Sequence, residues 1–305
     1  MPPTLGPVTR LHVGPRPVSV AVTPDAAWVV TSGNATVSRV DPGTGRVQAS
    51  LPFRRELIFA TVADGRLWVV HAPIGAFALN DEIVGQVELS VIDPSTNRTV
   101  ARFGIGSWFH NALGLERDLA VGSGAVWVAV QGADEVTRFD ATTGKVLDRI
   151  ALPKPTAVAV DGQTLWVATA DGRPHSIDIR TGAAKVRATT DLVTRIRVGQ
   201  GGLWLMTFDG KVLRLDRRTG RIVAQVPGSF QAADLAVGAE GVWVYDQHQG
   251  AVLRIDPGTN RVVRTIQAIS QPQVELHSYV PALGAGVVGV VDKAGEAVVR
   301  VDPHR

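Results

Sequence analysis

The chain has 305 residues, of which 45% are hydrophobic and 19% are charged, so it carries enough apolar material for a sizeable core and is not a disordered chain. Its 31 basic and 28 acidic residues are dispersed and leave a net charge of only +3, which argues against a nucleic-acid-binding stripe. No apolar run approaches the roughly 20 residues of a membrane helix, and the absence of cysteine excludes disulfides, thiol nucleophiles and thiolate zinc sites.

The first residues, MPPTLGPVTR, lack the apolar stretch of a secretory signal. The sequence as given therefore predicts a cytoplasmic protein, and a signal removed beforehand would leave export open. The first predicted element is a β-strand at residues 8–13 (VTRLHV), which stands alone before a series of repeats begins.

The repeats follow in chain order and share one pattern, shown by VSVAVTPDAAWVVTSGNATVSRVDPGTGRV (18–47), LAVGSGAVWVAVQGADEVTRFDATTGKV (119–146) and LAVGAEGVWVYDQHQGAVLRIDPGTNRV (235–262). Six tryptophans recur in register, with successive spacings of 40, 59, 39, 38 and 39 residues, and a blade of a propeller is typically about 40 residues long: Trp28, Trp68, Trp127, Trp166, Trp204 and Trp243. Residues 284–302 form a seventh copy, in which we expect Val288 at the tryptophan position.

Each copy predicts four short strands. An apolar first strand is followed by the tryptophan strand, and the third strand ends at an aspartate that opens a tight turn of the Asp-Pro-Gly-Thr-Gly type. The inner strands are apolar almost throughout, so both of their faces must be buried. Blades packed radially bury both faces, and the tryptophan fills the space between neighbouring blades.

The chain ends predict ring closure. The seventh copy stops after its third strand, and residues 8–13 stand where a fourth strand would. We therefore predict an all-β protein: a single domain over residues 1–305 forming a seven-bladed β-propeller of four-stranded blades, closed by residues 8–13 as the fourth strand of blade seven. The blades are expected to start near residues 18, 58, 118, 156, 194, 234 and 278.

The unit at 18–47 resembles the YVTN-type propeller repeat, and LAVGSGAVWVAVQGADEVTRFD resembles the repeats of the virginiamycin B lyase group. The resemblance covers nearly the whole chain and implies the propeller fold. It does not specify a function, because propellers carry many unrelated functions.

The long insertions are predicted to lie on one face of the ring. They lengthen the second-to-third-strand loop of blade two (71–89) and two connections between blades (103–118 and 267–279). Long loops on one rim are usually functional. We therefore expect ligand-binding residues at this end of the axial channel: Arg16, Glu56, His71, Trp108, His110, Glu116, Lys154, Gln231, His248 and Tyr279.

The most specific pattern is Glu275-Leu276-His277, which opens blade seven. In an extended strand, residues two apart point the same way, so Glu275 and His277 are expected to face the channel together. Asp292 ends the second strand of the same blade and should reach the same rim. A carboxylate beside an imidazole favours a general base, and two carboxylates with water could hold Mg²⁺.

This arrangement resembles the virginiamycin B lyase site, in which a Glu-x-His and a carboxylate ending the second strand serve a Mg²⁺-dependent elimination that opens a cyclic depsipeptide. The resemblance implies that His277 removes a proton next to a carbonyl, while Mg²⁺ held by Glu275 and Asp292 stabilises the enolate. The chain differs from that family in three ways: the spacing is one residue longer, the second acid is aspartate, and Gln231 stands where the family has histidine.

Two functional interpretations remain open. The first, which we favour at this point, is an enzyme with lyase-like chemistry on a small polar or peptide-like molecule, with Mg²⁺ as its only cofactor. The second is a non-catalytic propeller that binds a ligand, a peptide or a protein on the same face. We expect a monomer, with no nucleic-acid partner and no membrane segment.

Overall fold

The structure is a computed structural model. It describes residues 8–23, 25–74, 86–107, 118–227, 232–239, 241–269, 282–284, 287–292 and 296–302.

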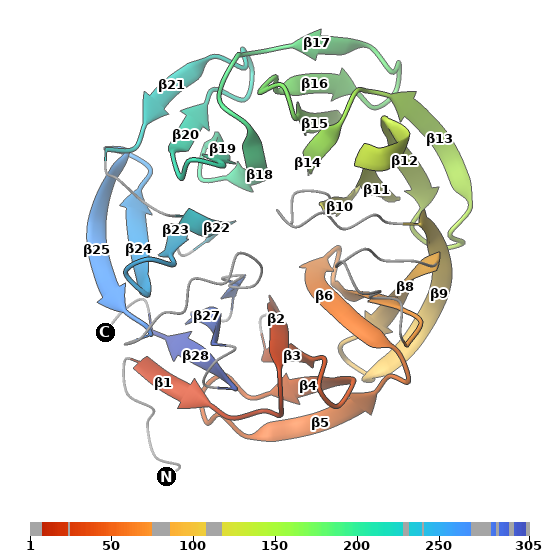
Figure 1. The fold of residues 1–305 in the computed structure, drawn as a ribbon, viewed down its shortest axis with the longest axis vertical. Helices are drawn as coiled ribbons and strands as arrows, with labels where there is room; N and C mark the ends of the chain where they lie inside the picture. The colour runs from red at the N-terminus through yellow and green to blue at the C-terminus, as the bar shows by residue number, and fades with distance from the viewer. Residues whose placement is uncertain are drawn as a thin grey trace.

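Seven four-stranded antiparallel sheets are arranged in a ring around a central axis (Figure 1). Blade one consists of β2 (Pro17–Thr23), β3 (Ala26–Thr31), β4 (Thr36–Val40) and β5 (Val47–Pro52). Blade two consists of β6 (Glu56–Ala63), β7 (Arg66–Ala72), β8 (Gln86–Asp93) and β9 (Arg98–Ser107). Blade three consists of β10 (Leu119–Gly122), β11 (Ala125–Val130), β12 (Glu135–Asp140) and β13 (Val146–Ala151). Blade four consists of β14 (Pro155–Asp161), β15 (Thr164–Thr169), β16 (His175–Asp178) and β17 (Ala184–Val186). Blade five consists of β18 (Val193–Gly199), β19 (Gly202–Thr207), β20 (Val212–Leu215) and β21 (Ile222–Gln225). Blade six consists of β22 (Ala232–Gly238), β23 (Gly241–Asp246), β24 (Ala251–Asp256) and β25 (Arg261–Gln267).

Blade seven combines the two ends of the chain. It consists of β26 (Ala282–Gly284), β27 (Val287–Asp292), β28 (Ala297–Val301) and β1 (Val8–Leu11), with Val8 opposite Val301. Figure 1 shows β1 beside β28 where the ring closes. The predicted seven-bladed propeller, closed by an N-terminal strand, is confirmed.

The repeated tryptophans are buried between blades. Trp28 of β3, for example, has no exposed surface and packs against Leu57, Ala60 and Val69 of the next blade. In four blades an arginine on the third strand lies over the tryptophan ring, at 5.0–6.0 Å from its centroid: Arg39, Arg138, Arg214 and Arg254. This cation–π contact adds to the burial energy of each ring.

Blade seven departs from the prediction at the tryptophan position. Arg300 lies opposite Gly289, as Arg254 lies opposite Trp243, so Gly289 and not Val288 is equivalent to the tryptophans. A Cβ at Gly289 would be 3.2 Å from Val20 Cγ1, because the valine of blade one occupies this space. Arg300 instead donates from Nε to the carbonyl of Pro42 (2.6 Å), which ties blade seven to blade one.

The aspartates that end the third strands stabilise turns. Asp41 Oδ1, for example, accepts hydrogen bonds from the backbone N–H groups of Gly43 and Thr44, both at 2.8 Å. The hydrogen bond from the Thr44 backbone is the main reason that the pKa of Asp41 lies below its ordinary value. Equivalent bonds hold Asp140, Asp178, Asp216 and Asp256. These carboxylates are therefore part of the architecture.

The structure is almost free of helix, and among the described residues the only helix is the short 3-10 turn η1 (Gln131–Ala133). No helix in the described ranges is long and apolar enough to cross a membrane.

Candidate functional site

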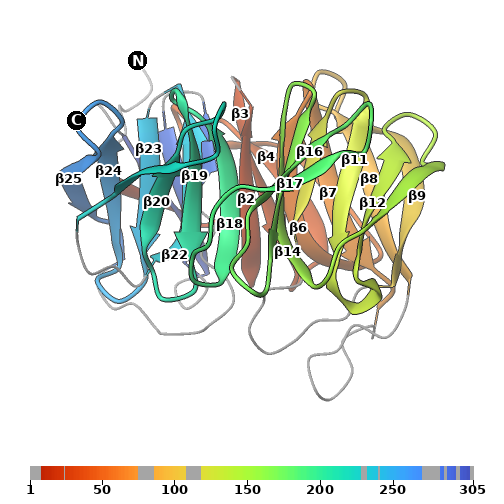
Figure 2. The same cartoon turned by 90° about the horizontal axis from the view of Figure 1, so that it is seen from above.

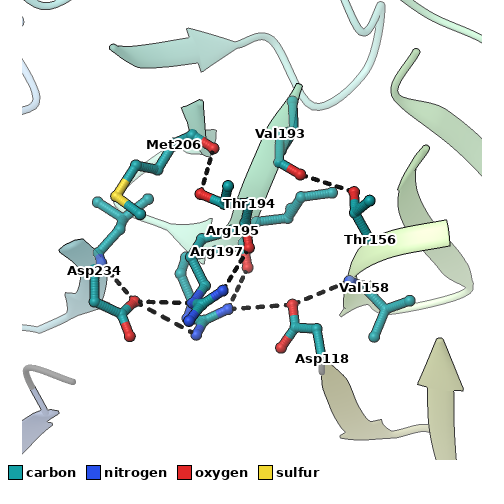
Figure 3. A network of polar contacts seen from close by, with 11 residues as sticks. Asp118, Thr156, Val158, Val193, Thr194, Arg195, Arg197, Met206 and Asp234 are labelled. Carbon is teal, nitrogen blue, oxygen red and sulfur yellow. Dashed lines mark hydrogen bonds and ion pairs between the residues drawn. The ribbon is translucent and has the colours of Figure 1, made fainter. Parts of the chain in front are cut away.

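Charged side chains from the innermost strands of blades three, five and six meet at one place (Figure 3). Arg195 and Arg197 lie on β18, Asp234 lies on β22, and Asp118 directly precedes β10. We call these four residues the axial network. Each lies in or just before the first strand of its blade.

Arg197 breaks a pattern that the other blades keep. It lies opposite Trp204, and the residue opposite the tryptophan or its equivalent glycine is alanine in five other blades and threonine in the sixth: Ala21, Ala120, Ala159, Ala236, Ala282 and Thr61. The fold therefore uses a small side chain at this position. A guanidinium group there points to a role beyond packing.

The network joins blades that are not neighbours. Arg197 Nη1 lies 3.6 Å from Asp118 Oδ2, and Arg197 Nη2 lies 3.9 Å from Asp234 Oδ1. Arg195 Nε lies 3.4 Å from the same oxygen of Asp234. Blade four separates Asp118 of blade three from Arg197 of blade five, so this contact forms where the inner strands converge on the axis (Figure 1).

Asp118 also has a structural role. Its Oδ2 accepts a hydrogen bond from the Val158 backbone N–H of the next blade (3.1 Å). Between blades one and two, Ser19 Oγ likewise accepts a hydrogen bond from the Ala60 backbone N–H (3.2 Å). Burial raises the pKa of the Asp118 carboxyl above its usual value, against the opposing effect of Arg197 and Arg195. For Arg195, burial lowers the pKa, but the charges of Asp234 and Asp118 outweigh it and the net shift is upward.

Asp234 is not fully satisfied. Its side chain is 1% exposed, and its Oδ1 accepts a hydrogen bond from the Leu235 backbone N–H (2.6 Å). Its Oδ2 is buried and has no hydrogen-bond partner among the residues that the structure describes. A buried carboxylate oxygen without a donor is costly, so Oδ2 is free to accept a further hydrogen bond.

The two arginines keep most of their donors available. Arg195 Nη1 donates to the carbonyl of Thr194 (2.7 Å), and Arg197 Nη1 donates to the carbonyl of Ile196 (2.8 Å). Their side chains are 20% and 32% exposed. Each guanidinium has five N–H donors, so both can bind an additional acceptor from the solvent side.

Two threonines lie beside the network. Thr156 Oγ1 donates to the carbonyl of Val193 (2.7 Å), and Thr194 Oγ1 donates to that of Met206 (3.2 Å) (Figure 3). Both side chains are buried, and their hydrogen bonds join β14 to β18 and β18 to β19.

The described residues that we predicted to bind a ligand fall into two groups. Arg16, Lys154 and His248 are exposed and lie in connections between strands, and none takes part in the axial network. Their backbones are held locally; the N–H of Lys154, for example, donates to Asp134 Oδ1 (2.8 Å). Glu56 and His71 lie in blade two, where Glu56 pairs with Ala72, the neighbour of His71.

His71 is fully buried in a polar cluster of blade two. Its Nε2 lies 2.7 Å from Ser90 Oγ, and its Nδ1 lies 3.7 Å from Glu88 Oε2. Arg102 Nε donates to Ser90 Oγ (3.1 Å), so the serine hydroxyl can donate to Nε2 and leave the imidazole proton on Nδ1. Burial, followed by the charges of Arg102 and Arg55, lowers the pKa of His71 to about 4.

This burial predicts a pH dependence of stability. The unfolded chain binds a proton at His71 below pH about 6.5 and the folded chain only below about 4, so stability should fall as the pH drops through that interval, by up to about 3 kcal/mol. Urea unfolding at several pH values should show this loss. A His71→Gln variant should not show it, and an unchanged pH profile in that variant would contradict the assignment.

The predicted elimination site lies mostly outside the described residues. Only Asp292 falls within them; Glu275 and His277 do not, nor do Trp108, His110, Glu116, Gln231 and Tyr279. Asp292 is 2% exposed and forms an ion pair with Arg10 of β1. Asp292 lies opposite Ala297 in blade seven, as Asp246 lies opposite Ala251 in blade six. The carboxylate of Asp246 accepts hydrogen bonds from backbone N–H groups of the turn that follows it.

The observed partner of Asp292 competes with a metal role. A magnesium ion there would have to displace the Arg10 guanidinium from the carboxylate. Within the described parts of the chain, no group of three or more histidine, aspartate or glutamate side chains is arranged to hold a metal ion. The elimination chemistry and the Mg²⁺ site therefore stay predictions.

Sequence reasoning missed the four members of the axial network. The signal that could have found them is a shared position in the repeat. Arg195 and Asp234 each lie opposite the residue two places after the tryptophan of their blade. In blade three the equivalent residue is Ala129, whose backbone N–H donates to the carbonyl of Asp118. Aligning the repeats strand by strand would have shown charged residues in columns that are otherwise small or apolar.

The comparisons with known proteins support a propeller. The family model described as outer membrane protein assembly factor BamB matches residues 85–233, just under half of the chain. The crystal structure of the computationally designed Ika8 protein has a TM-score of 0.68 at 16% identity, over 96% of this chain and 98% of that one, which shows the fold alone. No curated protein matches the chain. Because 1558 chains of solved structures match, the likeness identifies a widespread fold and not a function.

Proposed function

We propose that the chain is a non-catalytic binding propeller, whose axial network takes up a small polar ligand through Arg195, Arg197 and Asp234. The observation that carries the proposal is Arg197, a guanidinium group in a position where five other blades have alanine. Arginine is not needed there for packing, and its half-buried guanidinium lies beside two carboxylates.

The arrangement suits binding better than turnover. The network offers hydrogen-bond donors and a buried acceptor, which orient a ligand. Among the residues that the structure describes, the hydroxyls beside the network, those of Thr156 and Thr194, both donate to backbone carbonyls. The lyase-like enzyme stays a prediction, because Glu275 and His277, which would carry its chemistry, lie outside the described residues.

A thermal-shift screen tests the proposal. Small carboxylates, amino acids, sugars and inorganic phosphate would be added one at a time to the wild type and to Arg197→Ala. We expect at least one compound that stabilises the wild type and binds the variant about 10- to 100-fold more weakly, as is typical when a charged hydrogen bond is lost. The ring should still fold, because alanine is the residue that other blades use.

The matched control is Arg149→Ala. Arg149 forms an ion pair with Glu135 on the outside of blade three, so its loss should leave binding unchanged. If Arg197→Ala alters folding, Arg197→Gln keeps most of the side chain while removing its charge. A panel without any stabilising compound, or compounds that bind all variants equally, would refute the proposal.

A further inference from the structure

The axial network is balanced in charge as it stands. It contains two guanidinium groups and two carboxylates, and Asp234 and Asp118 are 1% and 6% exposed. A ligand with a net charge would add an uncompensated charge to a largely buried site, which is unfavourable. A ligand whose positive and negative groups cancel keeps the balance.

The unused atoms of the network are complementary to such a ligand. Asp234 Oδ2 is a buried acceptor without a partner in the described structure, and it requires a donor, best a positively charged one. Arg195 and Arg197 hold unused N–H donors, whose fork geometry matches a carboxylate. An acceptor and a pair of donors thus lie side by side on β22 and β18 (Figure 3).

The two carboxylates hold Arg197 only loosely. Its contacts of 3.6 Å to Asp118 and 3.9 Å to Asp234 are longer than the roughly 3.2 Å limit of a good hydrogen bond. The guanidinium is therefore attracted by both carboxylates without being bonded directly to either. It can turn toward a ligand carboxylate and leave its place beside Asp234 to a ligand donor.

We infer that the axial network binds a zwitterion of the α-amino-acid type. Arg195 and Arg197 bind the carboxylate, and Asp234 binds the ammonium group through Oδ2. Asp118 holds the Val158 backbone and balances the charge of Arg197. This inference rests on the proposed binding function and specifies its ligand class.

Calorimetric titration tests the inference. Each of the twenty common amino acids would be titrated, and the tightest one compared with its analogue that lacks the amino group and with its amide, which lacks the carboxylate. We expect the amino acid to bind at least about tenfold more tightly than either analogue, because each loses one charged contact.

Two matched variants separate the ammonium contact from a general charge effect. Asp234→Asn keeps an oxygen for the Leu235 N–H but loses the charge, and it should reduce the tenfold preference for the amino acid to near unity. Asp148→Asn also removes one carboxylate charge, from the exposed strand β13 outside the network, and keeps an acceptor for the Arg149 N–H. It should leave the preference intact.

The outcomes distinguish the two proposals. If the deaminated analogue binds as tightly as the amino acid, or if Asp234→Asn keeps the preference, the zwitterion inference is wrong, while Arg197-dependent binding would still support a binding propeller. If no amino acid binds but another small molecule does so through Arg197, the conclusion is the same. If nothing binds in an Arg197-dependent way, both proposals are wrong.

Discussion

Replacing Trp243 with alanine should lower the free energy of unfolding by about 3–5 kcal/mol, the usual cost of truncating a large buried aromatic side chain. Trp243 has no exposed surface and packs against Val288, Val290 and Val299 of blade seven. The substitution leaves a cavity between two blades, and it also removes the surface over which Arg254 lies, 6.0 Å from the ring centroid.

Urea unfolding followed by circular dichroism measures this effect without depending on the lost fluorophore. Trp243→Phe should cost clearly less, because the smaller ring still fills part of the space. Val223→Ala provides a surface control, since Val223 is 56% exposed on the outer strand β21. A midpoint for Trp243→Ala close to that of the surface control would mean that the blades do not depend on this contact.

Deleting residues 1–13 should open the ring. The deletion removes β1 and the buried side chains of Leu11 and Val13, each worth about 1.5–3 kcal/mol of burial. It also leaves β28 as an unpaired edge strand, and such edges promote association between chains. We expect a lower urea midpoint and, by light scattering, concentration-dependent association.

Adding the peptide VTRLHV (residues 8–13) should restore part of the stability, because it can pair with β28 in the observed register, Val8 opposite Val301. A peptide of the same composition in scrambled order is the control. A truncated chain as stable and as monodisperse as the full one would show that closure by β1 does not contribute to stability.

Most of the fold could be predicted because its signals are local. The tryptophan recurrence and the Asp-x-x-Thr turns are readable from neighbouring residues, and the turn hydrogen bonds of Asp41 and Asp140 follow from that chemistry. The one-residue error at Val288 has a physical reason. Blade seven has no tryptophan to mark the register, and Val20 of blade one occupies the space beside Gly289 that a side chain there would need.

The candidate site was much less predictable. Its members come from blades three, five and six, so their proximity depends on the curvature of the ring and not on spacing along the chain. Likewise, His71 is an apparent rim residue in the sequence. Its burial beside Ser90 and Glu88 results from the packing of blade two.

The amino-acid sequence alone therefore determined the number of blades, the strands of each blade and the closure by the chain's first strand, because repeats, turn residues and apolar runs act over short distances. Only the tertiary structure decided that Asp118, Arg197 and Asp234 meet near the axis and that Asp292 is paired with Arg10. Contacts between distant segments depend on how the blades pack against one another, and side-chain packing across blades has no short-range signature in the chain.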